Sequence, residues 1–292
     1  MISAALKQWL KQFAIVVKLR NLLLFIWERR TPRRVGDWRI IDHLPTFRPD
    51  SAGSSEVLAP LTVQSAEGTF PALVELLRVL GRPPIATVDI QSFCRTEEER
   101  EAAAQLKGLL DHYGSDKANN HNYHLLYGPI LSAPETIESI LEVGLGTNNT
   151  DTPSHMGSIG RPGASLRAFC DYLPRAQIFG ADVDRRILFQ EGRISTFFVD
   201  QMDLTTVEAL SALLPNEMDL IIDDGLHSPA ANIAILLLAV PKLKIGGWVI
   251  IEDIPSASIP VWRVISSLMP ASFECSIVAA AGGNLFVARR AS

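Results

Sequence analysis

The sequence contains few cysteines, no internal repeat and no low-complexity tract. Its three cysteines, Cys94, Cys170 and Cys275, are far apart and lack the short spacing of a zinc site. So few cysteines also exclude a disulfide-rich scaffold and favour a reducing compartment. The 292 residues, 47% hydrophobic and 20% charged, suffice for one large globular domain with an appended segment.

The sequence also lacks a long uninterrupted apolar run. Its most apolar stretch, from Leu6 to Trp27, is broken by Lys11, Lys18 and Arg20, whereas a membrane-spanning helix needs about 20 nearly uninterrupted apolar residues. The same charges, with no small-residue cleavage site after them, argue against a cleaved signal peptide. Most basic side chains of the stretch share a narrow helical arc, which is typical of an amphipathic helix at a membrane surface. Packing on the same chain or on a second subunit explains the pattern equally well.

Charge is distributed unevenly along the chain. Residues 1–36 hold eight basic side chains against Glu28 alone, a net of +7, so the remaining residues sum to −12 within the overall −5. A basic segment on an acidic body predicts contact of that segment with an anionic surface, and it argues against nucleic acid as a partner of the body. We expect a cytoplasmic protein, which is peripheral at the inner membrane surface if the segment binds a membrane.

Three regions are expected along the chain: a basic amphipathic segment (1–36), a linker with an auxiliary or lid region (37–110), and the main domain (111–292). In the middle region, helical spacing predicts a helix over Phe70–Leu80, and Thr96 with Glu99 forms a capping box for another. Further along, short apolar strands alternate with helical segments. This order is typical of a parallel sheet with right-handed crossovers.

One expected strand, Ile140–Val143, runs into a glycine turn with the pattern Glu142-x-Gly144-x-Gly146. Both glycines are expected where the backbone turns tightly against a ligand. A dinucleotide fingerprint would place a third glycine three residues after Gly146, but Asn149 stands there. The turn therefore suits a ligand that has no pyrophosphate, and the acid Glu142 suits a cationic amino group.

Ionisable side chains follow the other expected strands. Because ligands bind at the carboxyl ends of parallel strands, these side chains are expected on one rim of the sheet. The rim comprises Gly144, Gly146, Asp182, Asp200, Asp224, His227, Glu252 and Asp253. Asp182 is the expected ligand of a ribose diol, and Asp184 is the competing candidate.

Three acids on this rim, Asp224, Glu252 and Asp253, offer only hard oxygen ligands, which suit Mg²⁺ or Mn²⁺ better than zinc. His227 follows Asp224 by three residues, close enough to take a proton from a hydroxyl bound at the same ion. The alternative is that these acids are solvated strand ends and His227 a helix-start residue.

A polar stretch precedes the first of these strands: Gly114-Ser115-Asp116-Lys117, then His121, Tyr123, His124 and Tyr127. So many hydrogen-bonding side chains predict a segment that covers the site. A solvated loop is the alternative.

In these motifs the sequence resembles class I S-adenosylmethionine-dependent methyltransferases. More narrowly, it is similar to the metal-dependent O-methyltransferases that act on sugar hydroxyls of macrolide antibiotics. The matching residues are Glu142-x-Gly144-x-Gly146, Asp182, Asp223-Asp224-Gly225-Leu226-His227 and Ile251-Glu252-Asp253, within roughly residues 110–292, and the stretch from Gly114 to Tyr127 also matches.

The resemblance implies a Rossmann-like fold with a seven-stranded, mostly parallel sheet that ends in an antiparallel hairpin. It also implies that Asp224, Glu252 and Asp253 hold Mg²⁺ and that His227 is the general base. S-adenosylmethionine is expected against Glu142, Gly144, Gly146, Asp182, Asp200, Gln201 and Asp223.

The acceptor and the oligomeric state stay open, a homo-oligomer included. The basic segment has no counterpart in the resemblance, so a lipid-linked glycan competes with a soluble glycosylated or polyketide-like acceptor. Two other function classes remain. A nucleotide-dependent oxidoreductase or epimerase is disfavoured by Asn149, and a non-catalytic glycan-assembly scaffold is disfavoured by the intact set of acids with His227.

Overall fold

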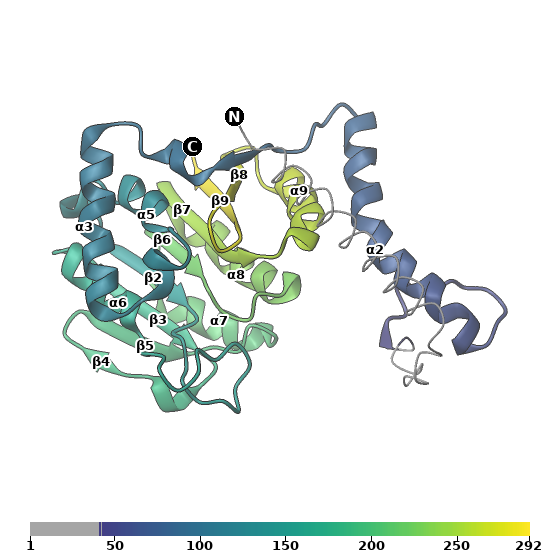
Figure 1. Cartoon of the computed structure of the whole chain (residues 1–292), viewed down its shortest axis with the longest axis horizontal. Helices are drawn as coiled ribbons and strands as arrows, with labels where there is room; N and C mark the ends of the chain where they lie inside the picture. Colours follow the sequence, from purple (N-terminus) through teal and green to yellow (C-terminus); the bar gives the residue numbers. More distant parts are fainter. Residues whose placement is uncertain (1–40, 42) are drawn as a thin grey trace, which may run out of the picture. The chain divides into compact units, whose positions relative to one another are not determined.

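The computed structural model of the protein describes residue 41 and residues 43–292. By its internal contacts the chain divides into two compact units, one ending at Thr69 and the other running from Phe70 to Ser292 (Figure 1). The amphipathic segment 1–36 and its boundary lie outside the described residues. The second unit begins well before residue 111, whereas the lid role of residues 37–110 stays a prediction.

The described part of the first unit consists mainly of the beginning of α2 (Ser55–Val79). Leu58 and Ala59 on this helix form a small buried apolar cluster with Ile41. The predicted helix over 70–80 is thus the second half of a longer helix. Pro60 and Gly68 are poor helix formers, and they hide the helical pattern of the first half in the sequence.

The second unit is built on one nine-stranded sheet. From edge to edge its strands are β1 (Thr87–Asp89), β8 (Phe273–Ala279), β9 (Asn284–Arg290), β7 (Leu243–Ile254), β6 (Met218–Asp223), β2 (Ser139–Val143), β3 (Gln177–Asp182), β5 (Ile194–Phe198) and β4 (Gln190–Glu191). The central pairs β7–β6, β6–β2, β2–β3 and β3–β5 are parallel. Strand β9 lies antiparallel to both β7 and β8, which confirms the predicted hairpin.

The predicted count of seven strands is two short. Strands β2, β3, β5, β6, β7, β8 and β9 match the prediction, whereas β1 and β4 were not expected. Strand β1 pairs parallel with β8 at one edge, and β4 pairs antiparallel with β5 at the other. They have only 3 and 2 residues, too few to leave an alternating apolar pattern in the sequence.

Helices cover both faces of the sheet (Figure 1). On one face are α3 (Glu97–Tyr113), α5 (His124–Ile130) and α6 (Ala164–Tyr172), and on the other α7 (Leu204–Leu213), α8 (Pro229–Lys242) and α9 (Ile259–Leu268). Successive strand residues point to opposite faces. Ile140, Leu220 and Ile250 therefore pack with the first layer, whereas Leu141, Ile221 and Ile251 pack with the second.

Local sequence signals fix where two of these helices begin. The predicted capping box starts α3: the Thr96 hydroxyl accepts from the Glu99 amide at 3.2 Å, and the Glu99 carboxylate accepts from the Thr96 amide at 2.8 Å. Ser228 caps α8 and is followed by Pro229, so this helix begins just beyond the rim formed by Asp224 and His227. No helix among the described residues combines the length and the hydropathy needed to cross a bilayer.

Candidate active site

The glycine turn after β2 is required by the chain itself. Gly144 and Gly146 have φ of +93° and +75°, in the left-handed region. A Cβ at Gly144 would lie 2.0 Å from the backbone oxygen of Asp224, and one at Gly146 would lie 2.3 Å from Sδ of Met156. The contact of these glycines with a ligand stays a prediction, and the fold adds a constraint of its own. Gly144 is needed first because the end of β6 passes directly against it.

Two pockets adjoin this turn and share Gly144, Gly146, Ser154 and Asp224 in their walls. The first, of about 280 Å³, has apolar walls from Val143, Val183, Val199, Met202 and Leu226, with Asp182, Asp200 and Gln201 as polar groups. The second, of about 100 Å³, is lined by ionisable groups that include Lys117, Glu142, Arg161, His227 and Asp253. An apolar pocket and a charged pocket thus meet at Asp224.

Between the two candidate ribose ligands, the structure places Asp182 and not Asp184 in the wall of the first pocket. The Asp182 carboxylate accepts from the amides of Leu145 at 2.7 Å and Asp184 at 2.8 Å, and burial raises its pKa. Asp184 is buried among Thr147, Asn149 and Arg186, and its hydrogen bond from Arg186 holds its pKa well below the usual range. Asn149, which replaces the third glycine, therefore anchors the loop.

The remaining predicted cofactor residues divide into two groups. Asp200 and Gln201 line the first pocket, but Asp223 lines neither pocket and is fully buried. Its carboxylate accepts from Gln201 Nε2 at 2.8 Å, from Asn232 Nδ2 at 2.8 Å and from the Gly225 amide. Burial raises the pKa of Asp223 to about 6. Asp223 thus anchors the loop after β6 from behind the pocket.

Lys117 lies at the centre of three carboxylates in the second pocket. It belongs to the short helix α4 (Asp116–Asn119), and its side chain is 2% exposed. Its Nζ is 2.5 Å from Glu252 Oε2, 2.6 Å from Asp224 Oδ2 and 3.1 Å from Glu142 Oε1. Burial lowers the pKa of the ammonium, but the attraction of Asp224, Glu252 and Glu142 outweighs it and raises the pKa well above its ordinary value. Burial raises the pKa of Glu142 and Glu252.

Two tyrosines of the same polar stretch hold the acids of β7. Tyr127 donates its hydroxyl hydrogen to Glu252, and Tyr123 donates to Asp253. Burial raises the pKa of both phenols, so they remain protonated donors. His121 lies between Asp253, at 3.4 Å, and Asp116, whose carboxylate raises the pKa of His121. The stretch predicted to cover the site is thus largely buried, and it supports the acids.

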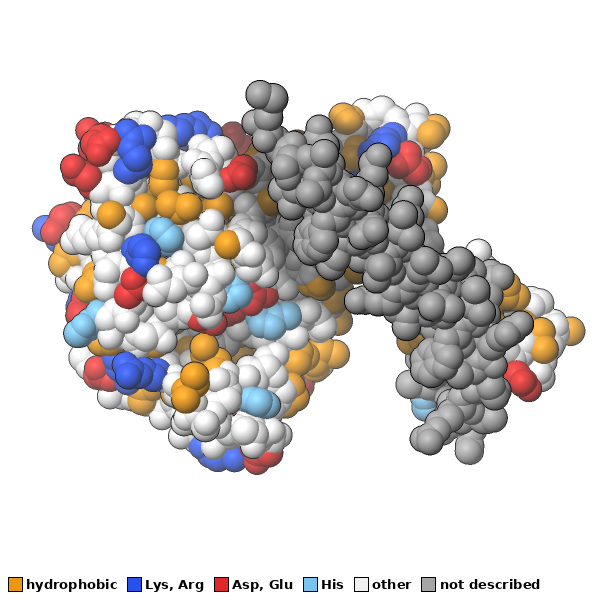
Figure 2. All heavy atoms as spheres, viewed as in Figure 1, with side chains coloured by type: hydrophobic (Ala, Val, Ile, Leu, Met, Phe, Trp, Pro, Cys, Tyr) orange, Lys and Arg blue, Asp and Glu red, His pale blue; other side chains and the backbone are white. Residues whose placement is uncertain are grey.

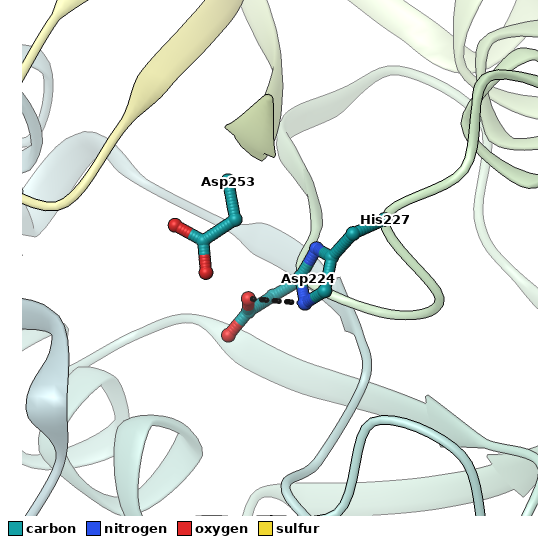
Figure 3. Close-up of side chains that lie close together, drawn as sticks. All are labelled: Asp224, His227 and Asp253. Atoms are coloured by element: carbon teal, nitrogen blue, oxygen red, sulfur yellow. Dashed lines mark ion pairs between the residues drawn. The ribbon is translucent and has the colours of Figure 1, made fainter. Parts of the chain in front are cut away.

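Asp224, His227 and Asp253 form the cluster drawn in Figure 3, in which one ligand atom of each lies within 4.8 Å of the others. His227 Nε2 is 3.9 Å from Asp224 Oδ1, too far for a hydrogen bond. His227 Nδ1 is buried with no hydrogen-bond partner among the described residues. In the space-filling view, acidic and histidine side chains gather in one area of the second unit (Figure 2).

Two of the three predicted metal ligands belong to this cluster, and the third, Glu252, does not. Asp224 and Asp253 are brought together as expected. Glu252 faces Lys117 and Tyr127 instead, since neighbouring residues of a strand point to opposite sides. His227 and Asp253 both have φ of +54°. Such a conformation costs a non-glycine residue about 1–3 kcal/mol and is concentrated at functional sites.

The known proteins to which the chain is similar are methyltransferases, the class that its motifs resemble. No model of a known protein family matches the chain. It is 27% identical over 186 residues to the 8-demethyl-8-α-L-rhamnosyl tetracenomycin-C 2′-O-methyltransferase of Streptomyces olivaceus, a match of 64% of this chain and 47% of the relative. It is 33% identical over 98 residues to the mycinamicin VI 2″-O-methyltransferase of Micromonospora griseorubida, 34% of this chain and 24% of the relative. The chain thus spans about half the length of the first relative and about a quarter of the length of the second.

A solved structure of the MycE methyltransferase from the mycinamycin biosynthetic pathway, in complex with Mg and SAH, is similar at a TM-score of 0.51 and 22% identity. The match covers 64% of this chain and 54% of that chain. At this level of sequence identity the similarity supports the fold alone, and it confirms the predicted Rossmann-like architecture. The chain therefore shares the Rossmann-like fold of this methyltransferase.

Proposed function

We propose that the protein is an S-adenosylmethionine-dependent O-methyltransferase that uses Mg²⁺ or Mn²⁺ and acts on a hydroxyl of a sugar in a glycosylated, polyketide-like acceptor. The observation that carries the proposal is the meeting of the two pockets at Asp224, beside His227 and Asp253. The names of the relatives, which are O-methyltransferases of glycosylated compounds, support the same reaction class.

The first pocket suits the nucleoside part of the methyl donor. Its apolar walls match a flat purine, and the Asp182 carboxylate provides an acceptor for ribose hydroxyls. The second pocket adjoins it through Gly144 and contains Glu142, whose charge suits the amino group of the donor. The reactive sulfonium would then lie near Asp224, where the acceptor hydroxyl must approach from the side opposite the leaving sulfur.

The cluster residues fit a hard divalent cation. Asp224 and Asp253 present carboxylate oxygens, and the unpartnered His227 Nδ1 shows a polar group without a protein partner. Asp224 and Asp253 would hold the ion, with Glu252 as the third acid that the resemblance implies. A bound divalent ion lowers the pKa of a hydroxyl placed on it. His227, on the loop after β6, is the residue placed to accept the proton from that hydroxyl.

Filling the first pocket should weaken binding of S-adenosylhomocysteine. Val183 lines this pocket, and Val183→Trp adds a large ring there. We expect the dissociation constant measured by calorimetry to rise about tenfold or more, because overpacking typically costs about 1–3 kcal/mol. Leu213→Trp on α7, an exposed position outside the pocket, is the matched control. Unchanged affinity in a folded Val183→Trp protein would place the donor elsewhere, and tight binding of NAD would favour the oxidoreductase alternative.

The acceptor class can be tested directly with a panel of glycosides. The protein, S-adenosylmethionine and Mg²⁺ are incubated with polyketide glycosides that carry a free vicinal diol, and the products are analysed by mass spectrometry. A single added methyl group on the sugar is expected, because two adjacent hydroxyls can chelate one ion. Matched glycosides with one hydroxyl of the diol blocked should react poorly. Lack of methylation across the panel, in protein that binds S-adenosylhomocysteine, would contradict this acceptor class.

The membrane contact proposed for residues 1–36 depends on their +7 charge and broken apolar run. These residues lie outside the described part of the chain, so the contact stays a prediction from sequence, as does the choice between a soluble and a lipid-linked acceptor.

A further inference from the structure

The charge balance around Lys117 singles out this residue in the charged pocket. Glu142, Asp224 and Glu252 each have a carboxylate oxygen within 3.1 Å of its ammonium, and Asp253 lies close to Asp224. Glu142, Glu252 and Lys117 are each about 1% exposed. If all three carboxylates are ionised, one ammonium leaves two negative charges in excess. Buried charge without a partner is strongly destabilising, so Lys117 is the cation that lets these acids converge.

The position of the ammonium also affects what else can bind there. Asp224 directs Oδ2 to Lys117, while its Oδ1 faces His227. Any divalent cation held by Asp224 would therefore share that carboxylate with Lys117. Because the ammonium of Lys117 is buried and little screened by solvent, it repels a divalent ion held a few ångströms away on Asp224 and so opposes the binding of that ion.

We propose that Lys117 is a positioning residue that serves as an internal counter-cation of the carboxylate centre and competes there with the divalent ion. This inference rests on the proposed function, because it takes the carboxylate centre to be the metal site. With the ion absent, Lys117 holds Glu142, Asp224 and Glu252 together. With the ion bound, Lys117 lowers the affinity of the carboxylate centre for that ion, so that the ion dissociates more readily.

The test replaces Lys117 by methionine, which is similar in length and carries no charge. Binding of MnCl₂ and MgCl₂ to the full chain is measured by calorimetry, and Mn²⁺ binding also by electron paramagnetic resonance. Lys117→Met should bind Mn²⁺ at least about tenfold more tightly than the wild type, because the repulsion of one unit charge is removed. A merely structural role for Lys117 would lower the affinity or leave it unchanged.

Thermal stability provides an independent readout. With chelator present, Lys117→Met should melt well below the wild type, because its carboxylates then lack a cation. Millimolar Mg²⁺ should restore most of the difference, since a ligand that binds the folded state stabilises it. The wild type should respond much less to Mg²⁺. Lys242→Met is the matched control, because Lys242 at the end of α8 donates to the backbone oxygen of Leu214 and to Asn216, outside the charged pocket. It should change neither the metal affinity nor the response to Mg²⁺.

If Lys117→Met does not fold even with Mg²⁺, the double variant Lys117→Met/Glu142→Gln removes one positive and one negative charge together. It should fold and should bind Mn²⁺ more tightly than Glu142→Gln alone. Equal or weaker Mn²⁺ binding after loss of Lys117, in either folded background, overturns the inference. A wild type that binds neither Mn²⁺ nor Mg²⁺ would instead overturn the proposed metal site. The two failures are thus distinguishable.

Discussion

Replacing His227 by alanine is expected to reduce kcat by about 10²–10⁴-fold, the usual cost of losing a positioned base. His227 lies at the rim where the two pockets meet, with Nε2 3.9 Å from Asp224 Oδ1 and Nδ1 without a protein hydrogen bond. Single-turnover rates should be measured together with the affinities for S-adenosylhomocysteine and Mn²⁺. If His227 is the base, these two affinities should change little while the rate falls.

The same measurements separate a base from a metal ligand, which matters because His227 belongs to the cluster with Asp224 and Asp253. A parallel loss of Mn²⁺ affinity and rate in His227→Ala would make the histidine a ligand. Near-wild-type turnover would show that His227 is neither the base nor a required metal ligand, and that it only begins the segment before α8. His112→Ala, an exposed histidine on α3, is the control for replacing an imidazole elsewhere.

Removal of divalent cations is expected to abolish turnover, and addition of Mg²⁺ or Mn²⁺ should restore it. The physical reason is that a sugar hydroxyl is too weak an acid to react unaided, and a cation on the carboxylates lowers its pKa. Asp224→Asn keeps the shape of the side chain but removes its charge. We therefore expect it to lose Mn²⁺ affinity and activity together, while binding of S-adenosylhomocysteine is largely kept.

An acid outside the charged pocket provides the control. Asp171 accepts a hydrogen bond from Tyr113 and lines neither pocket at the turn, so Asp171→Asn should leave Mn²⁺ affinity and turnover unchanged. Full activity of a metal-free preparation would contradict metal dependence. In that case the carboxylates and Lys117 would form an ion-pair network without a metal.

Most of the fold could be predicted from local patterns. Strands such as β2, β3 and β6 are apolar runs bounded by turn residues, and the capping box at Thr96 marks the start of α3. The edge strands β1 and β4 could not be predicted in the same way, because so short a strand is defined by its neighbour in the sheet. The beginning of α2 was missed because Pro60 and Gly68 obscure its helical pattern.

The candidate site shows the same division between local and long-range information. Because the strands alternate with helices, the sequence by itself determined that Asp182, Asp224, His227 and Asp253 lie at the carboxyl ends of strands, on one rim of the sheet. Side-chain direction and long-range contact were decided only by the tertiary structure. It turned Glu252 toward Lys117, a residue 135 positions away, and set the Asp224 backbone against Gly144. Such pairings depend on how distant segments pack against one another, so they cannot be predicted from the local spacing of residues.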